Sequence, residues 1–187
     1  MNKQPKTIEI EVKVKIENPK KLLDFLKKSG KFVASEHQLD TYFTPFHRNF
    51  VKVNPIKEWL RLRDSDGRYS INYKNWYYEE NGESNYCDEY ESQIAEYEKI
   101  KLILEALDMK QLVAVDKQRQ IWIYKDYEIA VDRVKNLRSF VEIEYKGDLK
   151  KQSPAQITQQ MLDFLTKLGC GTLERFFQGY PHQLLFK

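Results

Sequence analysis

Acidic and basic side chains alternate with aliphatic ones in the segment EIEVKVK, residues 9–15. Because side chains point to opposite faces along a β-strand, the charged residues share one face and the aliphatic residues share the other. The charged face carries Glu9, Glu11, Lys13 and Lys15. Carboxylates can hold a divalent cation, and ammonium groups can bind phosphate oxygens. The segment therefore predicts a strand whose charged face meets either water or an ionic ligand.

The same alternation recurs along the chain and predicts seven or eight strands. The further segments are EWLRLR (58–63), YSINYK (69–74), EYESQI (89–94), VDKQRQIWIY (115–124), YEIAVDRV (127–134) and FVEIEYK (140–146). Their charged faces carry the bases Arg61, Arg63, Lys74, Lys117 and Arg119 and the acids Glu89, Glu91, Asp132, Glu142 and Glu144. Asp66-Gly67, between two of these segments, predicts a hairpin turn.

Three segments show the apolar spacing of amphipathic helices. The first is residues 19–29, with Asn18 as N-cap and Gly30 at its end. The second is residues 94–107, and the third begins at Ser153-Pro154. An apolar helix stripe must pack on an apolar surface, and the aliphatic strand faces are the available one. The charged strand faces are therefore expected to point away from the helices.

Two α+β arrangements satisfy this pattern. In an open antiparallel sheet the charged faces meet water, which is common for such sheets. In a closed eight-stranded antiparallel β-barrel with helices packed outside, every charge lies inside a tunnel. Interior charges must pair, stay hydrated or hold ions. The 187 residues suit a single domain, 1–187, in either case.

A tunnel lined in this way predicts a particular ligand. Lysine and arginine side chains from several strands suit a polyanion such as a triphosphate. Carboxylates would repel that anion unless they hold a divalent cation, and Mg²⁺ typically takes one or two carboxylates together with waters and phosphate oxygens. The lining therefore points to a metal–triphosphate complex.

Composition argues against several other classes. The 31 basic and 28 acidic residues leave a formal charge of only +3, which argues against a nucleic-acid binder. The two cysteines are too few for a disulfide framework or a thiolate metal site, and no apolar run approaches membrane-spanning length. We expect a cytoplasmic protein with no membrane or nucleic-acid partner. The sequence is compatible with a homodimer.

These motifs carry a resemblance to a known family. Residues 9–13, EIEVK, resemble the Glu-x-Glu-x-Lys signature of the CYTH superfamily, also called triphosphate tunnel metalloenzymes. Further matches follow in order: HQLDTYF (37–43), EWLRLR (58–63), Tyr73-Lys74, EYE (89–91), DKQR (116–119), VDRV (131–134) and FVEIE (140–144). They cover nearly the whole chain. Residues 40–63 look most like the class IV adenylyl cyclase branch.

The resemblance implies an eight-stranded barrel that encloses a triphosphate and Mg²⁺ or Mn²⁺. It implies phosphate-binding roles for Lys13, Arg61, Arg63, Lys74, Lys117 and Arg119. The acidic positions of the family match Glu9, Glu11, Glu89, Glu91, Asp132, Glu142 and Glu144. Metal ligands are expected first among Glu9, Glu11, Glu142 and Glu144. The alternative for each acid, above all Glu89 and Asp132, is an internal ion pair.

The chemistry that the resemblance implies depends on the nucleophile. In a cyclase the ribose 3′ hydroxyl of ATP attacks the α-phosphorus, giving cyclic AMP and pyrophosphate. In a triphosphatase, water attacks the terminal phosphorus of tripolyphosphate or thiamine triphosphate. A non-catalytic polyphosphate or nucleotide sensor is the third reading. Lys117, assisted by Tyr42, is the candidate general base, although Tyr42 is equally explained as a packed aromatic residue.

Overall fold

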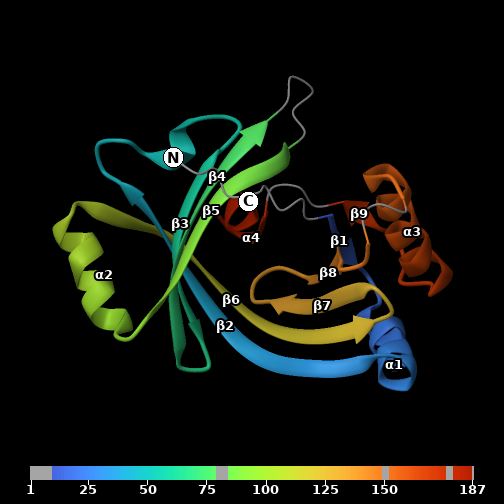
Figure 1. The fold of residues 1–187 in the computed structure, drawn as a ribbon. Helices are drawn as coiled ribbons and strands as arrows, with labels where there is room; N and C mark the ends of the chain where they lie inside the picture. The colour runs from blue at the N-terminus through green and yellow to red at the C-terminus, as the bar shows by residue number, and fades with distance from the viewer. Residues whose placement is uncertain (1–9, 79–83, 149–151, 176–178, 187) are drawn as a thin grey trace. The chain divides into compact units, whose positions relative to one another are not determined.

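The computed structural model describes residues 10–78, 84–148, 152–175 and 179–186 (Figure 1). The strands are β1 (Glu11–Ile16), β2 (Lys31–Pro45), β3 (Glu58–Ser65), β4 (Arg68–Tyr78), β5 (Ser84–Ile94), β6 (Met109–Tyr124), β7 (Tyr127–Val134), β8 (Ser139–Tyr145) and β9 (Glu174–Arg175). The helices are α1 (Pro19–Ser29), the 3₁₀ turn η1 (Phe50–Lys52), α2 (Tyr97–Ala106), α3 (Pro154–Lys167) and α4 (Gly179–Leu185).

The strands form one nine-stranded sheet with the hydrogen-bonded order β5-β4-β3-β2-β6-β7-β8-β1-β9. The pairings with a defined register are all antiparallel, so the expected antiparallel α+β fold is confirmed. The count is nine rather than eight because the two-residue strand β9 pairs with β1 beyond β8. Within the described ranges, backbone hydrogen bonding does not join β5 to the other end of the order.

The chain divides into two compact units. The first unit holds residues 1–36 and 117–179, and the second holds residues 37–116 and 180–187. The long strands β2 and β6 contribute to both, since each passes a unit boundary. The expectation of a single domain over 1–187 stays a prediction.

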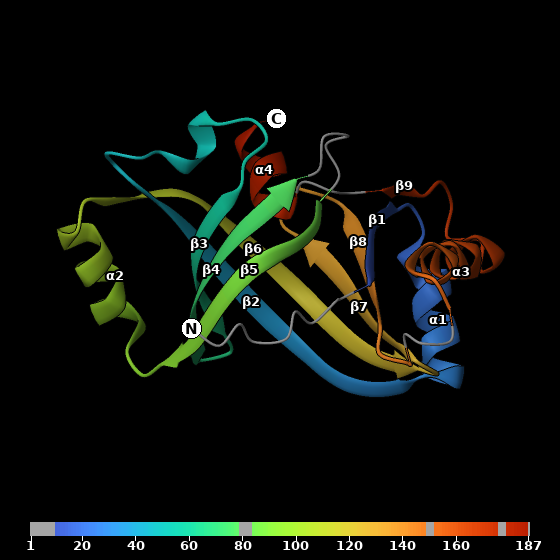
Figure 2. The ribbon, with the colours of Figure 1, turned by 45° about the horizontal axis from the view of Figure 1, so that its top comes forward.

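In the first unit the helices cover the aliphatic face of the strands, as expected. Leu22 and Leu26 of α1 and Met161 of α3 are fully buried and pack in one core with β-strand side chains. The strand side chains of that core are Val12, Val14, Ile16, Trp122, Ile129, Val131, Val141 and Ile143. Figure 2 shows α1 and α3 beside each other. The charged side chains of the same strands therefore point away from this core.

The ends of α1 and α3 follow from their capping residues. Pro19 occupies the first turn of α1, and Gly30 ends it, where an added Cβ would lie 2.9 Å from the Leu26 carbonyl oxygen. Asn18 is the N-cap residue, but its side chain makes no capping hydrogen bond. At α3, Ser153 and Gln156 form a reciprocal capping box.

In the second unit, α2 packs on the apolar face of the strands through Leu104, which contacts Phe43 and Leu62 in one core. The predicted start of this helix at residue 94 is wrong, because Ile94 still pairs with Tyr69 in the β4–β5 ladder. Asp66 and Gly67 form the predicted turn between β3 and β4, both with positive φ, 49° and 80°. No helix in the described ranges is long and apolar enough to cross a membrane.

Candidate functional site

Lys13 and Glu142 lie opposite each other on β1 and β8 and form an ion pair of 2.7 Å. Burial alone would raise the pKa of Glu142, but Lys13 and Arg119 lower this pKa well below its usual range. The pKa of Lys13 is raised, because Glu142 and Glu11 outweigh the opposing effect of burial. Both groups are therefore charged at neutral pH.

Arg119 joins this pair from β6. Its Nη2 lies 3.4 Å from Glu142 Oε2. Its guanidinium group also donates two hydrogen bonds to Asp132 on β7, from Nε at 2.8 Å and from Nη2 at 2.7 Å. The Lys117 amine lies 3.8 Å from the Asp132 carboxylate. We call Lys13, Lys117, Arg119, Asp132 and Glu142 the lysine–glutamate cluster. It gathers three cations around two carboxylates within the first unit.

Asp132 is the most deeply buried residue of this cluster. It is 1% exposed, while the Arg119 side chain above it is 14% exposed. Burial alone would raise the pKa of Asp132, but hydrogen bonds from Arg119 and the charge of Lys117 lower it. The structure therefore places this acid, one of the predicted metal positions, in ion pairs with two predicted phosphate ligands.

Glu11 and Glu144 offer the best described place for a metal ion. They are directly opposite in the β1–β8 register, so their side chains extend on the same face. Glu144 also pairs with Lys146 at 2.5 Å. Two carboxylates that share a face match the donor set that Mg²⁺ takes alongside waters and phosphate oxygens. Within the described ranges, no three Asp, Glu, His or Cys side chains come together as a preformed metal cage.

In the second unit, Asp40 of β2 binds two arginines of β3. Arg63 donates from Nε to Asp40 Oδ1 at 2.6 Å and from Nη2 to Oδ2 at 2.7 Å. Arg61 Nη1 lies 3.7 Å from Oδ2. The Nε of Arg61 is buried and has no hydrogen-bond partner in the part of the chain that the structure describes. We call Asp40, Tyr42, Arg61 and Arg63 the arginine cluster.

Tyr42 belongs to this cluster and also packs as an aromatic residue. Its ring meets Trp59 edge-on at 5.5 Å, and its side chain is hydrogen-bonded with Arg61. Burial, followed by the charge of Asp40, raises the pKa of the Tyr42 phenol. The hydroxyl is therefore neutral at ordinary pH, which suits a hydrogen-bond donor better than a proton acceptor.

The β4–β5 ladder brings the remaining predicted residues of the second unit together. Lys74 pairs with Glu89 at 2.9 Å, and Asn72 donates to the same carboxylate at 2.7 Å. These contacts lower the pKa of Glu89, although burial alone would raise it. Ser70 donates to Glu91 at 3.0 Å. Both glutamates of β5 thus have polar partners on β4.

The structure thus places some of the predicted residues in the lysine–glutamate cluster of the first unit and others in the arginine cluster of the second. Glu11 and Glu144 lie opposite each other on β1 and β8, and Lys74, Glu89 and Glu91 lie in the β4–β5 ladder. Glu9 lies outside the described residues. The roles of the other residues in binding and catalysis stay predictions. Asp40 was missed as a site residue, although it stands in the HQLDTYF match and shares its strand face with Tyr42.

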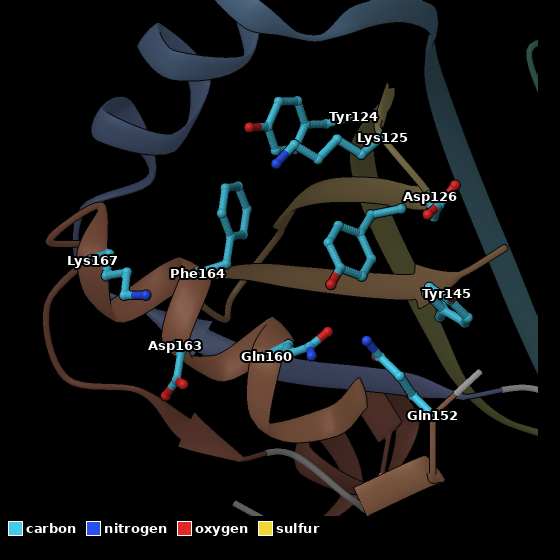
Figure 3. Close-up of a pocket in the computed structure, with 10 residues that line it drawn as sticks. Tyr124, Lys125, Asp126, Tyr145, Gln152, Gln160, Asp163, Phe164 and Lys167 are labelled. Carbon is cyan, nitrogen blue, oxygen red and sulfur yellow. The ribbon is translucent and has the colours of Figure 1, made fainter. Parts of the chain in front are cut away.

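A cavity lies in the first unit, and none of the predicted residues line it. It has a volume of about 430 Å³ and lies between the β6–β7 turn and α3 (Figure 3). Aromatic side chains line it, among them Tyr124, Tyr127 and Phe164, together with Lys125 and Asp163. Phe164 stacks on Tyr124 at 5.6 Å, so these rings continue the helix–strand packing of the unit.

Comparisons with known proteins identify the family of this chain. A curated protein of Methanocaldococcus jannaschii, "Putative adenylate cyclase MJ0240", is 32% identical over 164 residues, which cover 87% of this chain and 90% of that protein. The solved structure of PH1819 from Pyrococcus horikoshii is 27% identical, with a TM-score of 0.73 over 95% of this chain and 98% of its own. A conserved hypothetical protein of Pyrococcus furiosus is 25% identical, with a TM-score of 0.71 over 93% and 98%. The CYTH domain family matches residues 7–180, and the chain belongs to this family.

Proposed function

We propose that this protein is a Mg²⁺- or Mn²⁺-dependent enzyme that converts ATP to cyclic AMP and pyrophosphate. CYTH proteins generally process triphosphates with a divalent metal, and the similar protein of M. jannaschii carries the name "Putative adenylate cyclase MJ0240". The observation that carries the proposal is the pair of polar clusters, each with arginine or lysine side chains held by a deeply buried aspartate. Such preorganised cations suit the charge of a triphosphate.

In this proposal the basic side chains bind and orient the phosphates. The guanidinium groups of Arg61, Arg63 and Arg119 donate to phosphate oxygens, and Lys13, Lys74 and Lys117 add point charges. The 3′ hydroxyl attacks the α-phosphorus, its proton passes to a base, for which Lys117 is the candidate when its amine is deprotonated, and the bond to pyrophosphate breaks. The cations stabilise the negative charge that develops on the leaving pyrophosphate.

A divalent metal would be held by Glu11 and Glu144, with Glu9 and Glu142 as the further expected ligands. When bound, the metal supplies neutralisation of phosphate charge and alignment of the reacting groups. Glu142 would have to loosen its 2.7 Å contact with Lys13 to take part. A phosphate oxygen could then replace the carboxylate as the partner of Lys13.

The alternative is a triphosphatase that hydrolyses tripolyphosphate or thiamine triphosphate. The same set of cations and carboxylates could serve both reactions, because the two differ in the nucleophile and in the reacting phosphorus but not in the charge of the bound triphosphate. Product analysis separates them. Purified protein is incubated with ATP, and separately with tripolyphosphate, in Mg²⁺, in Mn²⁺ and in EDTA, and the products are resolved by ion-exchange chromatography.

Cyclic AMP with pyrophosphate from ATP supports the cyclase. Orthophosphate from tripolyphosphate without cyclic AMP supports the triphosphatase, and tight binding with intact ligand supports a sensor. Glu11→Ala and Arg63→Ala are expected to abolish turnover in folded protein. Glu174→Ala and Arg133→Ala are matched controls, because both side chains are exposed on strands of the first unit.

A further inference from the structure

Asp40 presents a problem for an anion-binding site. It is a carboxylate in the centre of the arginine cluster, where it would repel a bound phosphate. It is 1% exposed, and burying a charged carboxylate is costly unless the group is well paired. Its place therefore needs a reason beyond surface charge balance.

The geometry of the pair supplies that reason. Asp40 and Arg63 are direct register partners on β2 and β3, and both carboxylate oxygens accept from the guanidinium edge that holds Nε and Nη2. A two-point contact fixes the plane of a guanidinium group as well as its position. The remaining N–H donors of Arg63 then point away from Asp40.

The exposed fractions of the side chains indicate where the remaining N–H donors of Arg63 point. The Arg61 and Arg63 side chains are 16% and 17% exposed, whereas the carboxylate that holds them is almost fully buried. The acid thus lies beneath the bases, and the bases reach the accessible layer. The Nε of Arg61 is buried and has no hydrogen-bond partner among the residues that the structure describes. A ligand oxygen could accept a hydrogen bond from it.

The first unit repeats the arrangement. Asp132 is also 1% exposed, and its two carboxylate oxygens accept hydrogen bonds from Nε and Nη2 of Arg119 at 2.8 and 2.7 Å. Two strand pairs, β2–β3 and β6–β7, thus share one arrangement, in which a buried aspartate holds a more exposed arginine. An ion pair that served only to neutralise charge would not require this shared geometry.

We propose that Asp40 is a positioning residue that holds Arg63 and Arg61 in the orientation that binds phosphate oxygens. The inference rests on the proposed function, since it takes a triphosphate as the ligand. The inference predicts the direction in which the affinity for the anion changes when Asp40 is removed. If Asp40 acted only as a nearby negative charge, its removal would strengthen anion binding, and if it served only the fold, its removal would leave the affinity of folded protein unchanged. A positioning role requires weaker binding.

The test is calorimetric titration with tripolyphosphate in EDTA, where the basic residues bind without the metal. We expect Asp40→Asn to raise the Kd at least about tenfold, because it loses a charge-assisted two-point contact. Asp40→Glu, which keeps the charge but displaces the carboxylate, should raise the Kd as well. In an Arg63→Lys background, Asp40→Asn should add little, since the fork is already lost.

Thr41→Val is the matched control. Thr41 is the next residue of β2 and is also buried, but its hydroxyl accepts from Tyr97 in the packing of α2. It should lower the thermal midpoint and leave the Kd unchanged. An unchanged or lower Kd in Asp40→Asn, or in Asp40→Glu if the first variant does not fold, overturns the inference alone. Failure of the wild-type protein to bind tripolyphosphate in EDTA overturns the inference, and failure to bind or convert ATP or tripolyphosphate in Mg²⁺ or Mn²⁺ overturns the proposed function.

Discussion

Arg119 grips Asp132 across β6 and β7 with two hydrogen bonds, of 2.8 and 2.7 Å, from a single guanidinium edge. This contact occupies both oxygens of a carboxylate whose position in the family motif also made it a candidate metal ligand. A carboxylate used in this way stabilises the cluster and orients the arginine. The prediction for Asp132→Asn therefore treats Asp132 as an ion-pairing residue and not as a metal ligand.

Asp132→Asn should lower the free energy of unfolding by about 3–5 kcal/mol, because it leaves Arg119 and Lys117 without their buried counter-charge. Urea denaturation measures the loss. The Mn²⁺ affinity of the folded variant, measured by calorimetry, should equal that of the wild-type protein. A weakened Mn²⁺ affinity with unchanged stability would return Asp132 to the metal ligands.

The Lys13–Glu142 pair predicts how stability depends on pH. The pKa of Glu142 is lower in the folded protein than its usual 4.5, so its contribution is present above pH 4.5 and is lost as the pH falls through the folded pKa. The pKa of Lys13 is raised above 10.5, so its contribution is present below pH 10.5 and is lost as the pH rises through the folded pKa. The pair therefore stabilises the fold most between these limits.

Glu142→Gln should remove part of this dependence. Urea unfolding at a series of pH values below 4.5 should give a shallower decline in the free energy of unfolding than in the wild-type protein. Glu174→Gln is the control, since Glu174 pairs with Lys15 on the same strand β1 but its side chain is 64% exposed. Equal acid slopes in wild-type protein and Glu142→Gln would contradict the assignment.

Much of the fold was predictable because local patterns determine it. The alternation in β1 and β8 and the apolar stripes of α1 and α3 fixed which faces form the core. Pro19 and Gly30 marked both ends of α1. Ile94 shows the limit, because an apolar residue at helical spacing also suits the last position of a strand, and pairing with Tyr69 decided for the strand.

The site was less predictable, because alternation gives the face of a side chain but not its partner. The charged face of Asp132 followed from the sequence, yet its contact with Arg119 depends on β6 lying beside β7. Asp40 likewise acquires its role only when β2 pairs with β3 in the register that sets it against Arg63. A glutamate such as Glu142 suits both a metal ion and a lysine, and sequence alone does not choose between them.

The register pair Glu11 and Glu144 yields a prediction for the metal. Glu11→Gln and Glu144→Gln should each raise the Mn²⁺ concentration needed for half-maximal turnover by about tenfold or more, because each removes a charged ligand while keeping the side-chain volume. The reaction is assayed across a Mn²⁺ series at saturating substrate. Glu128→Gln, on the neighbouring strand β7 opposite Glu144, tests whether lost negative charge alone produces the shift.

The two candidates for the general base differ in their surroundings, and this difference yields the last prediction. The Tyr42 phenol has a raised pKa and is hydrogen-bonded with Arg61, so it is poorly suited to accept a proton near neutral pH. Lys117 is 4% exposed and sits 3.8 Å from Asp132 in a cluster with two further cations. Crowding by like charges disfavours the charged form of a lysine, whereas a nearby carboxylate such as Asp132 favours it, so Lys117 must release its own proton before it can act as the base.

Lys117→Met should therefore lower kcat by at least about a hundredfold, the usual contribution of a general base, while Tyr42→Phe should lower it by less than about tenfold. Tyr42→Phe keeps the ring contact with Trp59, so a large loss there would come from the hydroxyl and not from packing. Lys15→Met on β1 controls for the loss of a cation. If the ranking is reversed, with Tyr42→Phe the slower variant, the phenol and not the amine takes the proton, and the charge of Lys117 serves phosphate binding alone.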